Sequence, residues 1–162
     1  MPETSLRGVP FINGCMARGC SADGSVIYGS SWDNLDFGML YWKDGKVDWA
    51  GSDVRRIHTE INRYGEEEIC VDAMRCMADL TQISPNGTCI AGTYRTEEYD
   101  KENDEVLQAN SPAFFNTETK TTTVFDEYAG CVAMGVTDDG LGLIGIQGIC
   151  LLYTSPSPRD MR

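Results

Sequence analysis

The sequence predicts an all-β protein, a fragment of a β-propeller with about two and a half four-stranded antiparallel blades. Two observations lead to this prediction. A hairpin pattern centred on an Asp-Gly or Asn-Gly dipeptide occurs three times along the 162 residues. A second hairpin pattern follows each of the first two copies. Four short antiparallel strands per repeat are typical of a propeller blade.

The first hairpin of each repeat is defined by its turn, because Asp-Gly and Asn-Gly accept the positive φ angles of a tight turn. The three copies span Cys15–Gly29, Leu80–Gly92 and Cys131–Gly145. Their turn dipeptides are Asp23-Gly24, Asn86-Gly87 and Asp139-Gly140. The runs Val26–Tyr28 and Cys89–Ala91 are apolar on both faces, which favours strands that are covered on both sides.

The second hairpin runs from Met39–Trp42 through Asp44-Gly45 in the first repeat, and from Ala113–Asn116 through Thr117–Lys120 in the second. We align Met39 with Ala113. Without two insertions, the repeat has the length of about 40–45 residues that is usual for a four-stranded propeller blade. The predicted blade units are therefore residues 15–50, residues 76–126 and an incomplete unit at residues 131–149.

The two insertions lie between Gly51 and Asp79 and at about residues 95–110, where Glu and Asp predominate. We expect the acidic insertion to be a solvated loop. Helix is expected only in the insertion after Gly51, which also holds the single histidine, His58. We interpret His58 as a loop residue.

The C-terminal segment is treated separately. Residues 150–160 match, codon by codon, the in-frame translation of a transposase adapter used in sequencing libraries. Residues 150–162 are therefore interpreted as an adapter-derived scar that is not native, and residues 1–149 as the partial propeller. We expect Leu151–Arg162 to make few contacts. The first residues contain no apolar signal-peptide region.

Composition restricts the function classes. The chain has 13 Lys+Arg against 25 Asp+Glu and a net charge of −12, and its basic residues do not cluster, so we predict no nucleic-acid partner. The sequence contains no run of eighteen apolar residues, so we predict no transmembrane segment. One histidine and no C-x-x-C motif give no pattern for a metal site or a catalytic pair, so we predict no catalytic, metal-binding or cofactor-binding residue and no cofactor.

The motif residues resemble a known repeat class. Ser21–Ser31 followed by Met39–Val47 is similar to the HAF-type extracellular repeats and the related propeller-like lipoproteins of Bacteroidetes, although Pro112-Ala113-Phe114 lacks the histidine of the triad that names them. The resemblance implies an exported bacterial protein, located in the periplasm, at the cell surface or outside the cell. It implies a scaffold or binding module for a protein or carbohydrate ligand, with no defined reaction.

An alternative function is that of an N-terminal-nucleophile cysteine amidohydrolase of the dipeptidase or acylase type, with Cys15 as nucleophile. Cys15 and Ser21–Asp33 resemble the start of such enzymes. This function requires cleavage before Cys15 to free its α-amino group. Ser30 and Ser31 also stand where that motif has Arg and Asn. We therefore favour the non-enzymatic function.

Overall fold

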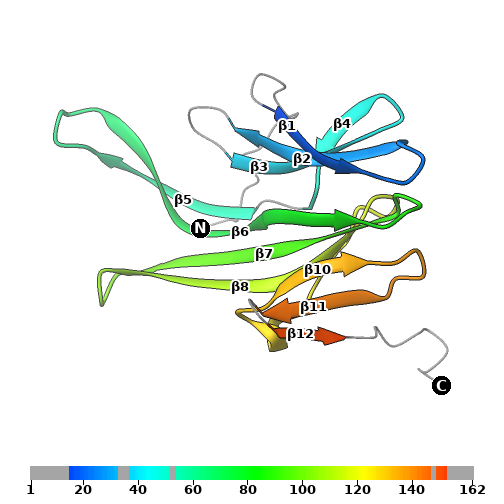
Figure 1. Cartoon of the computed structure of the whole chain (residues 1–162). Helices are drawn as coiled ribbons and strands as arrows, with labels where there is room; N and C mark the ends of the chain where they lie inside the picture. The colour runs from blue at the N-terminus through cyan, green and yellow to red at the C-terminus, as the bar shows by residue number, and fades with distance from the viewer. Residues whose placement is uncertain (1–14, 33–36, 52–53, 147–148, 153–162) are drawn as a thin grey trace.

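The computed structural model describes residues 15–32, 37–51, 54–146 and 149–152. These residues form three antiparallel sheets in which every strand pairs with the next one along the chain (Figure 1). The predicted all-β class with antiparallel sheets is confirmed. The described residues contain one short 3-10 helix, η1 (Asp126–Tyr128), and no helix among them is long and apolar enough to cross a membrane.

The first sheet corresponds to the first predicted repeat unit. Its strands, in spatial order, are β1 (Cys15–Cys20), β2 (Val26–Trp32), β3 (Phe37–Lys43) and β4 (Lys46–Trp49). The predicted turns at Asp23-Gly24 and Asp44-Gly45 are confirmed, and both glycines have a positive φ, at 73° and 70°.

The central sheet has five strands and is longer than predicted. They are β5 (Val54–Ile61), β6 (Glu67–Ile83), β7 (Cys89–Asp100), β8 (Glu105–Asn116) and β9 (Thr122–Val124). The expected helix after Gly51 is wrong, because that insertion forms β5 and the start of β6. The expected acidic loop at 95–110 is also wrong. Its backbone continues the β7–β8 ladder as far as the pair Asp100 and Glu105.

The third sheet contains β10 (Val132–Val136), β11 (Gly142–Ile146) and β12 (Ile149–Leu152). Leu151 pairs with Ile144 and Leu152 pairs with Leu143. The expectation of few contacts is therefore wrong for residues 151 and 152, which belong to an edge strand. The rest of the segment predicted to be a scar lies outside the described residues.

A serine or threonine two residues before the turn Asp or Asn closes each repeat turn. In the first turn, the Ser21 hydroxyl donates to Asp23 at 2.7 Å and accepts the Val26 N–H at 3.0 Å. Asp23 also accepts the Ser25 N–H at 3.0 Å. The second turn repeats these bonds with Ser84, Asn86, Thr88 and Cys89. The third uses Thr137, Asp139 and Leu141. The repeated motif is thus a local hydrogen-bonding unit.

Gly29 and Gly92, which end the first hairpin of the first two repeats, are required for a different reason. Gly29 and Gly92 lie opposite β-bulges in β1 and β6. A Cβ on Gly29 would lie 2.1 Å from the carbonyl oxygen of Met16, and one on Gly92 would lie 2.1 Å from that of Asp79. No side chain fits at these distances, so the close approach of two backbones requires glycine.

The sheets stack face to face, with the central sheet in the middle (Figure 1). The core between the first and central sheets includes Val26, Tyr28 and Met39 from one and Leu80, Ile90 and Phe115 from the other. The core between the central and third sheets contains Ala91, Ala133 and Val136, with Cys89 and Phe114 packed against them. Both faces of the central sheet are therefore buried in this region, as the apolar run Cys89–Ala91 predicted. The same prediction is wrong for Val26–Tyr28, because Ile27 is 36% exposed on the outer face of the first sheet.

The ladder register corrects the alignment of the second hairpins. Gly29 pairs with Leu40, and the equivalent Gly92 pairs with Ala113. Leu40, rather than Met39, is thus the counterpart of Ala113. A shift of one residue exchanges the two faces of a strand, so only the register shows which side chains lie in which core.

Candidate binding cleft and histidine cluster

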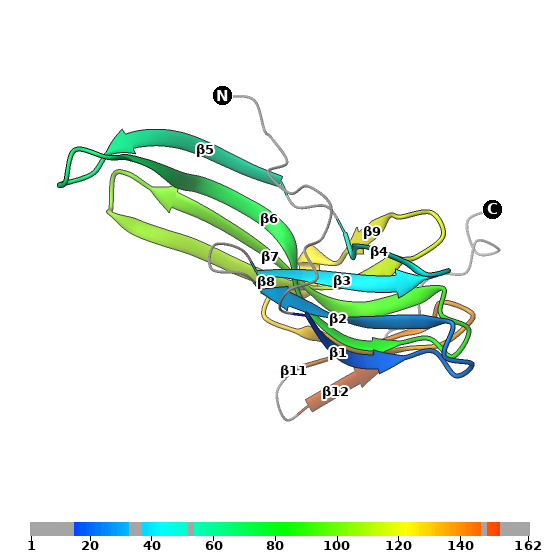
Figure 2. The same cartoon turned by 90° about the horizontal axis from the view of Figure 1, so that it is seen from above.

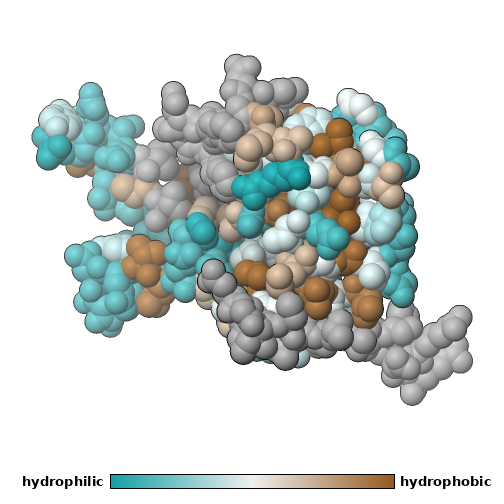
Figure 3. All heavy atoms as spheres, in the orientation of Figure 1, coloured by the Kyte–Doolittle hydropathy of each residue, from teal (hydrophilic) through white to brown (hydrophobic). Residues whose placement is uncertain are grey.

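Beyond the stacked region, β5–β8 continue as two projecting hairpins that bend away from the other sheets (Figure 2). Their surface is mainly hydrophilic, but hydrophobic atoms gather on the lobe formed by the β7–β8 end (Figure 3). The exposed apolar side chains there are Tyr99, Val106 and Leu107, which are 37%, 60% and 51% exposed. An apolar patch on an otherwise charged lobe is the usual sign of an interaction surface.

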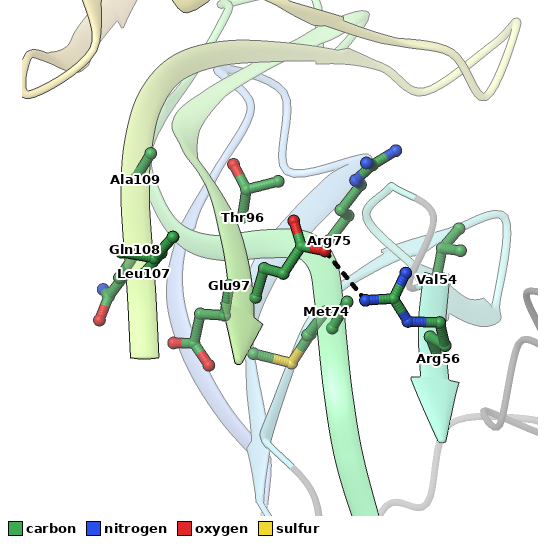
Figure 4. Close-up of a pocket in the computed structure, with 11 residues that line it drawn as sticks. Val54, Arg56, Met74, Arg75, Thr96, Glu97, Leu107, Gln108 and Ala109 are labelled. Carbon is green, nitrogen blue, oxygen red and sulfur yellow. Dashed lines mark hydrogen bonds and ion pairs between the residues drawn. The ribbon is translucent and has the colours of Figure 1, made fainter. Parts of the chain in front are cut away.

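A cleft of about 320 Å³ lies where these hairpins leave the stack (Figure 4). The four strands each contribute to its lining, which consists of Val54, Arg56, Ala73, Met74, Arg75, Thr96, Glu97, Glu98, Leu107, Gln108 and Ala109. This size is at the small end of ligand sites. The lining contains no aromatic side chain that would form a platform for a sugar ring.

The strand register arranges the lining in rows that cross the sheet. Thr96 pairs with Ala109 in one row, and Glu98 pairs with Leu107 two rows further along the strands. Alternate rows share a face, so these four side chains lie on the same side of the sheet. Arg56 reaches this face from β5, and its Nη2 lies 2.9 Å from Oε1 of Glu98 (Figure 4). The cleft therefore combines the apolar side chains of Leu107 and Ala109 with the Arg56–Glu98 ion pair.

One side of this face is an open strand edge. β9 pairs with β8 only at Ala113, Phe114 and Phe115. In the described part of the chain, no strand pairs with the outer edge of residues 105–109. This edge segment carries a single charged residue, Glu105, and all five residues are exposed. Unprotected edges of this kind accept an additional strand.

The opposite edge of the sheet, β5, is protected by charge. Arg56, His58 and Glu60 lie along it at alternate positions. Charged side chains on an edge strand hinder the pairing of another strand. Of the two edges, the 105–109 segment of β8 is therefore the better acceptor.

A second candidate site surrounds His58, which lies in β5 and is not the loop residue that the sequence predicted. Its Nε2 lies 2.7 Å from Oε1 of Glu60. Its Nδ1 lies 3.1 Å from Oδ1 of Asp72, although the ring N–H is not aligned for a hydrogen bond. Cys70 is directly opposite His58 in the ladder, and Lys101 lies 3.6 Å from Asp72.

These neighbours shift the pKa values of the cluster. The hydrogen bond that Nε2 of His58 donates to Glu60, together with the nearby Asp72 carboxylate, raises the pKa of His58 despite partial burial. Burial by itself would raise the pKa of Asp72, but the charges of His58, Lys101 and Arg56 outweigh it and lower that pKa. Burial, with the nearby carboxylates, raises the pKa of the Cys70 thiol.

No metal-site motif in the sequence predicts this cluster, although its residues are regularly spaced. His58 and Glu60 are separated by one residue, as are Cys70 and Asp72. In strands, this spacing places both members of a pair on the same face. Only the register of β5 with β6 brings the two pairs together. Because we expect helix and not strands in the insertion after Gly51, the sequence by itself does not show this spacing to be significant.

Cys15, the nucleophile of the alternative function, begins β1 and pairs with Ser31 of β2. Its side chain is half-buried. The other residues named with it, Ser21 and Ser30, are buried at 2% and 1% exposure, and Ser21 serves the turn described above.

Comparisons with family models, with curated proteins and with solved structures find no match to this chain.

Proposed function

We propose that the chain is a binding module of an exported bacterial protein, built from stacked propeller-type sheets, and that it binds an extended segment of a partner protein at β8. Three features support the propeller-type scaffold. Each sheet is an antiparallel meander, the same turn begins each repeat, and neighbouring sheets stack through apolar faces.

Equivalent residues in successive repeats support a further sheet on the outer face of the first one. Ile27 and Ile90 occupy the same position of the motif, three residues after the turn glycine. Ile90 is 0% exposed because the first sheet covers it, whereas Ile27 is 36% exposed. A sheet of the same repeat, stacked on the first sheet, would bury Ile27 as Ile90 is buried.

The observation that carries the binding function is the open edge of β8 beside the cleft. An added strand would form backbone hydrogen bonds with residues 105–109 and would place alternate side chains on the face that contains Leu107 and Ala109. The carboxylate of Glu105 lies on this edge, and that of Glu97 lies on the neighbouring strand β7. They favour a partner segment that alternates apolar and basic residues.

The test uses a nine-residue peptide of alternating valine and lysine as the probe. Amide hydrogen exchange, followed by NMR, is measured on the whole chain with and without the peptide. We expect slower exchange at residues 105–109. A peptide of the same sequence with alternate backbone amides methylated is the control, and it should give no protection because it cannot complete the ladder.

Two variants locate the binding edge. Leu107→Lys places a charge on the β8 edge and should abolish the protection. Ile61→Lys makes the same kind of change at an exposed position of β5 and should leave it intact. Protection along β5, or unchanged binding by Leu107→Lys, would disprove the proposal. Concentration-dependent association of the free chain through β8 would identify a second copy as the occupant instead.

A further inference from the structure

The His58 cluster has the composition of a transition-metal site. A nitrogen of His58, a carboxylate oxygen of Glu60 and the sulfur of Cys70 all lie within 4.8 Å of one another. In a tetrahedral zinc site with bonds of about 2.0–2.3 Å, ligand atoms are about 3.3–3.7 Å apart. Glu60 is an exposed, flexible side chain, so small rotations are sufficient to reach these separations.

The orientation of the imidazole strengthens this inference. Nε2 is directed at Glu60, while Nδ1 lies next to Asp72. Asp72 is buried, at 8% exposure, and its Oδ1 has no aligned hydrogen-bond donor among the described residues. A metal-bound histidine usually directs its other ring nitrogen at a carboxylate, which fixes the tautomer and the ring plane. The arrangement of Asp72 and His58 matches that pattern.

We propose that Nε2 of His58, the carboxylate of Glu60 and the thiolate of Cys70 bind one zinc ion, and that Asp72 positions the imidazole. The mixed nitrogen, oxygen and sulfur set favours zinc over calcium or magnesium, which prefer oxygen ligands. Three protein ligands leave the fourth tetrahedral position for water or an exogenous ligand.

The charges and protons of the site balance. Zinc displaces the thiol proton of Cys70 and the Nε2 proton of His58, and both go to solvent. The thiolate and the Glu60 carboxylate neutralise the two positive charges of the ion. Lys101, 3.6 Å from Asp72, compensates the remaining buried carboxylate.

The experiment titrates the metal-free whole chain with zinc by calorimetry and with cobalt by absorption spectroscopy. We expect one zinc ion per chain, with proton release that depends on the buffer. Cobalt should give the thiolate-to-metal charge-transfer band of a coordinated cysteine. Cys70→Ser should lose this band, and Cys20→Ser, which changes an exposed cysteine of β1, should keep it.

Two further variants distinguish the positioning role of Asp72 from a general effect of removing a carboxylate. Asp72→Asn should lower the zinc affinity by about 10–100-fold and retain the cobalt band, because Asp72 acts through His58. Asp79→Asn changes a carboxylate that pairs with Arg18 elsewhere and should leave the affinity unchanged. A wild-type chain that binds no zinc, or a Cys70→Ser variant that keeps full affinity with a native circular dichroism spectrum, would overturn the proposal.

Discussion

Replacement of Ile90 by alanine tests the stacked architecture most directly. Ile90 in β7 is fully buried against the first sheet. The substitution removes three carbon atoms, each worth about 0.8 kcal/mol of burial. With the cavity that remains, the loss of unfolding free energy should be about 3–4 kcal/mol, within the range of about 2–5 kcal/mol known for such changes.

Ile27→Ala is the matched control, because Ile27 is the same residue at the same position of the motif and is 36% exposed. Part of its side chain is already in contact with water and less apolar area is lost, so we expect a loss of only about 1–1.5 kcal/mol.

The assay is urea unfolding of the dilute protein, followed by the fluorescence of the three tryptophans, Trp32, Trp42 and Trp49, which all lie in strands of the first sheet. For a denaturant dependence of about 2 kcal/mol per M, the midpoint should fall by about 1.5–2 M for Ile90→Ala and by about 0.5–0.7 M for Ile27→Ala. Equal shifts for the two variants would refute the stacking of the first sheet on β7.

Two further predictions concern the turns and bulges. Hydrogen bonds from Ser25 and Ser21 lower the pKa of Asp23 from 3.8 to about 2. The stability they contribute is therefore present above the unfolded pKa and is lost as the pH falls from about 4 to about 2. Carboxyl NMR titration should report this pKa, and Asp23→Asn should remove that part of the acid dependence, as Asn86 does naturally in the second repeat. Gly92→Ala should reduce stability by several kcal/mol, because its Cβ would clash with the Asp79 carbonyl oxygen. Gly45→Ala meets no neighbouring atom and should cost only about 1–2 kcal/mol from its positive φ, as thermal unfolding will show.

The sequence by itself determined the repeat turns. The hydroxyl of Ser21, the carboxylate of Asp23 and the positive φ of Gly24 lie within four residues of the chain, and the N–H that Ser21 accepts belongs to the nearby Val26. Local hydrogen bonds and backbone sterics are sufficient to specify such a turn wherever the motif occurs. For this reason the positions of the repeat hairpins, and their antiparallel strands, follow from the motif.

Only the tertiary structure decided which faces are buried and which distant residues meet. Ile27 and Ile90 have the same local context, but the first sheet covers only Ile90. The charged insertions lack the apolar alternation of buried strands, and they are nevertheless strands because the ladders of β6–β8 continue through them. The His58 cluster likewise depends on the register of β5 with β6. Register and sheet stacking are non-local, since they are set by backbone pairing and burial across the whole fold, and no short segment encodes them.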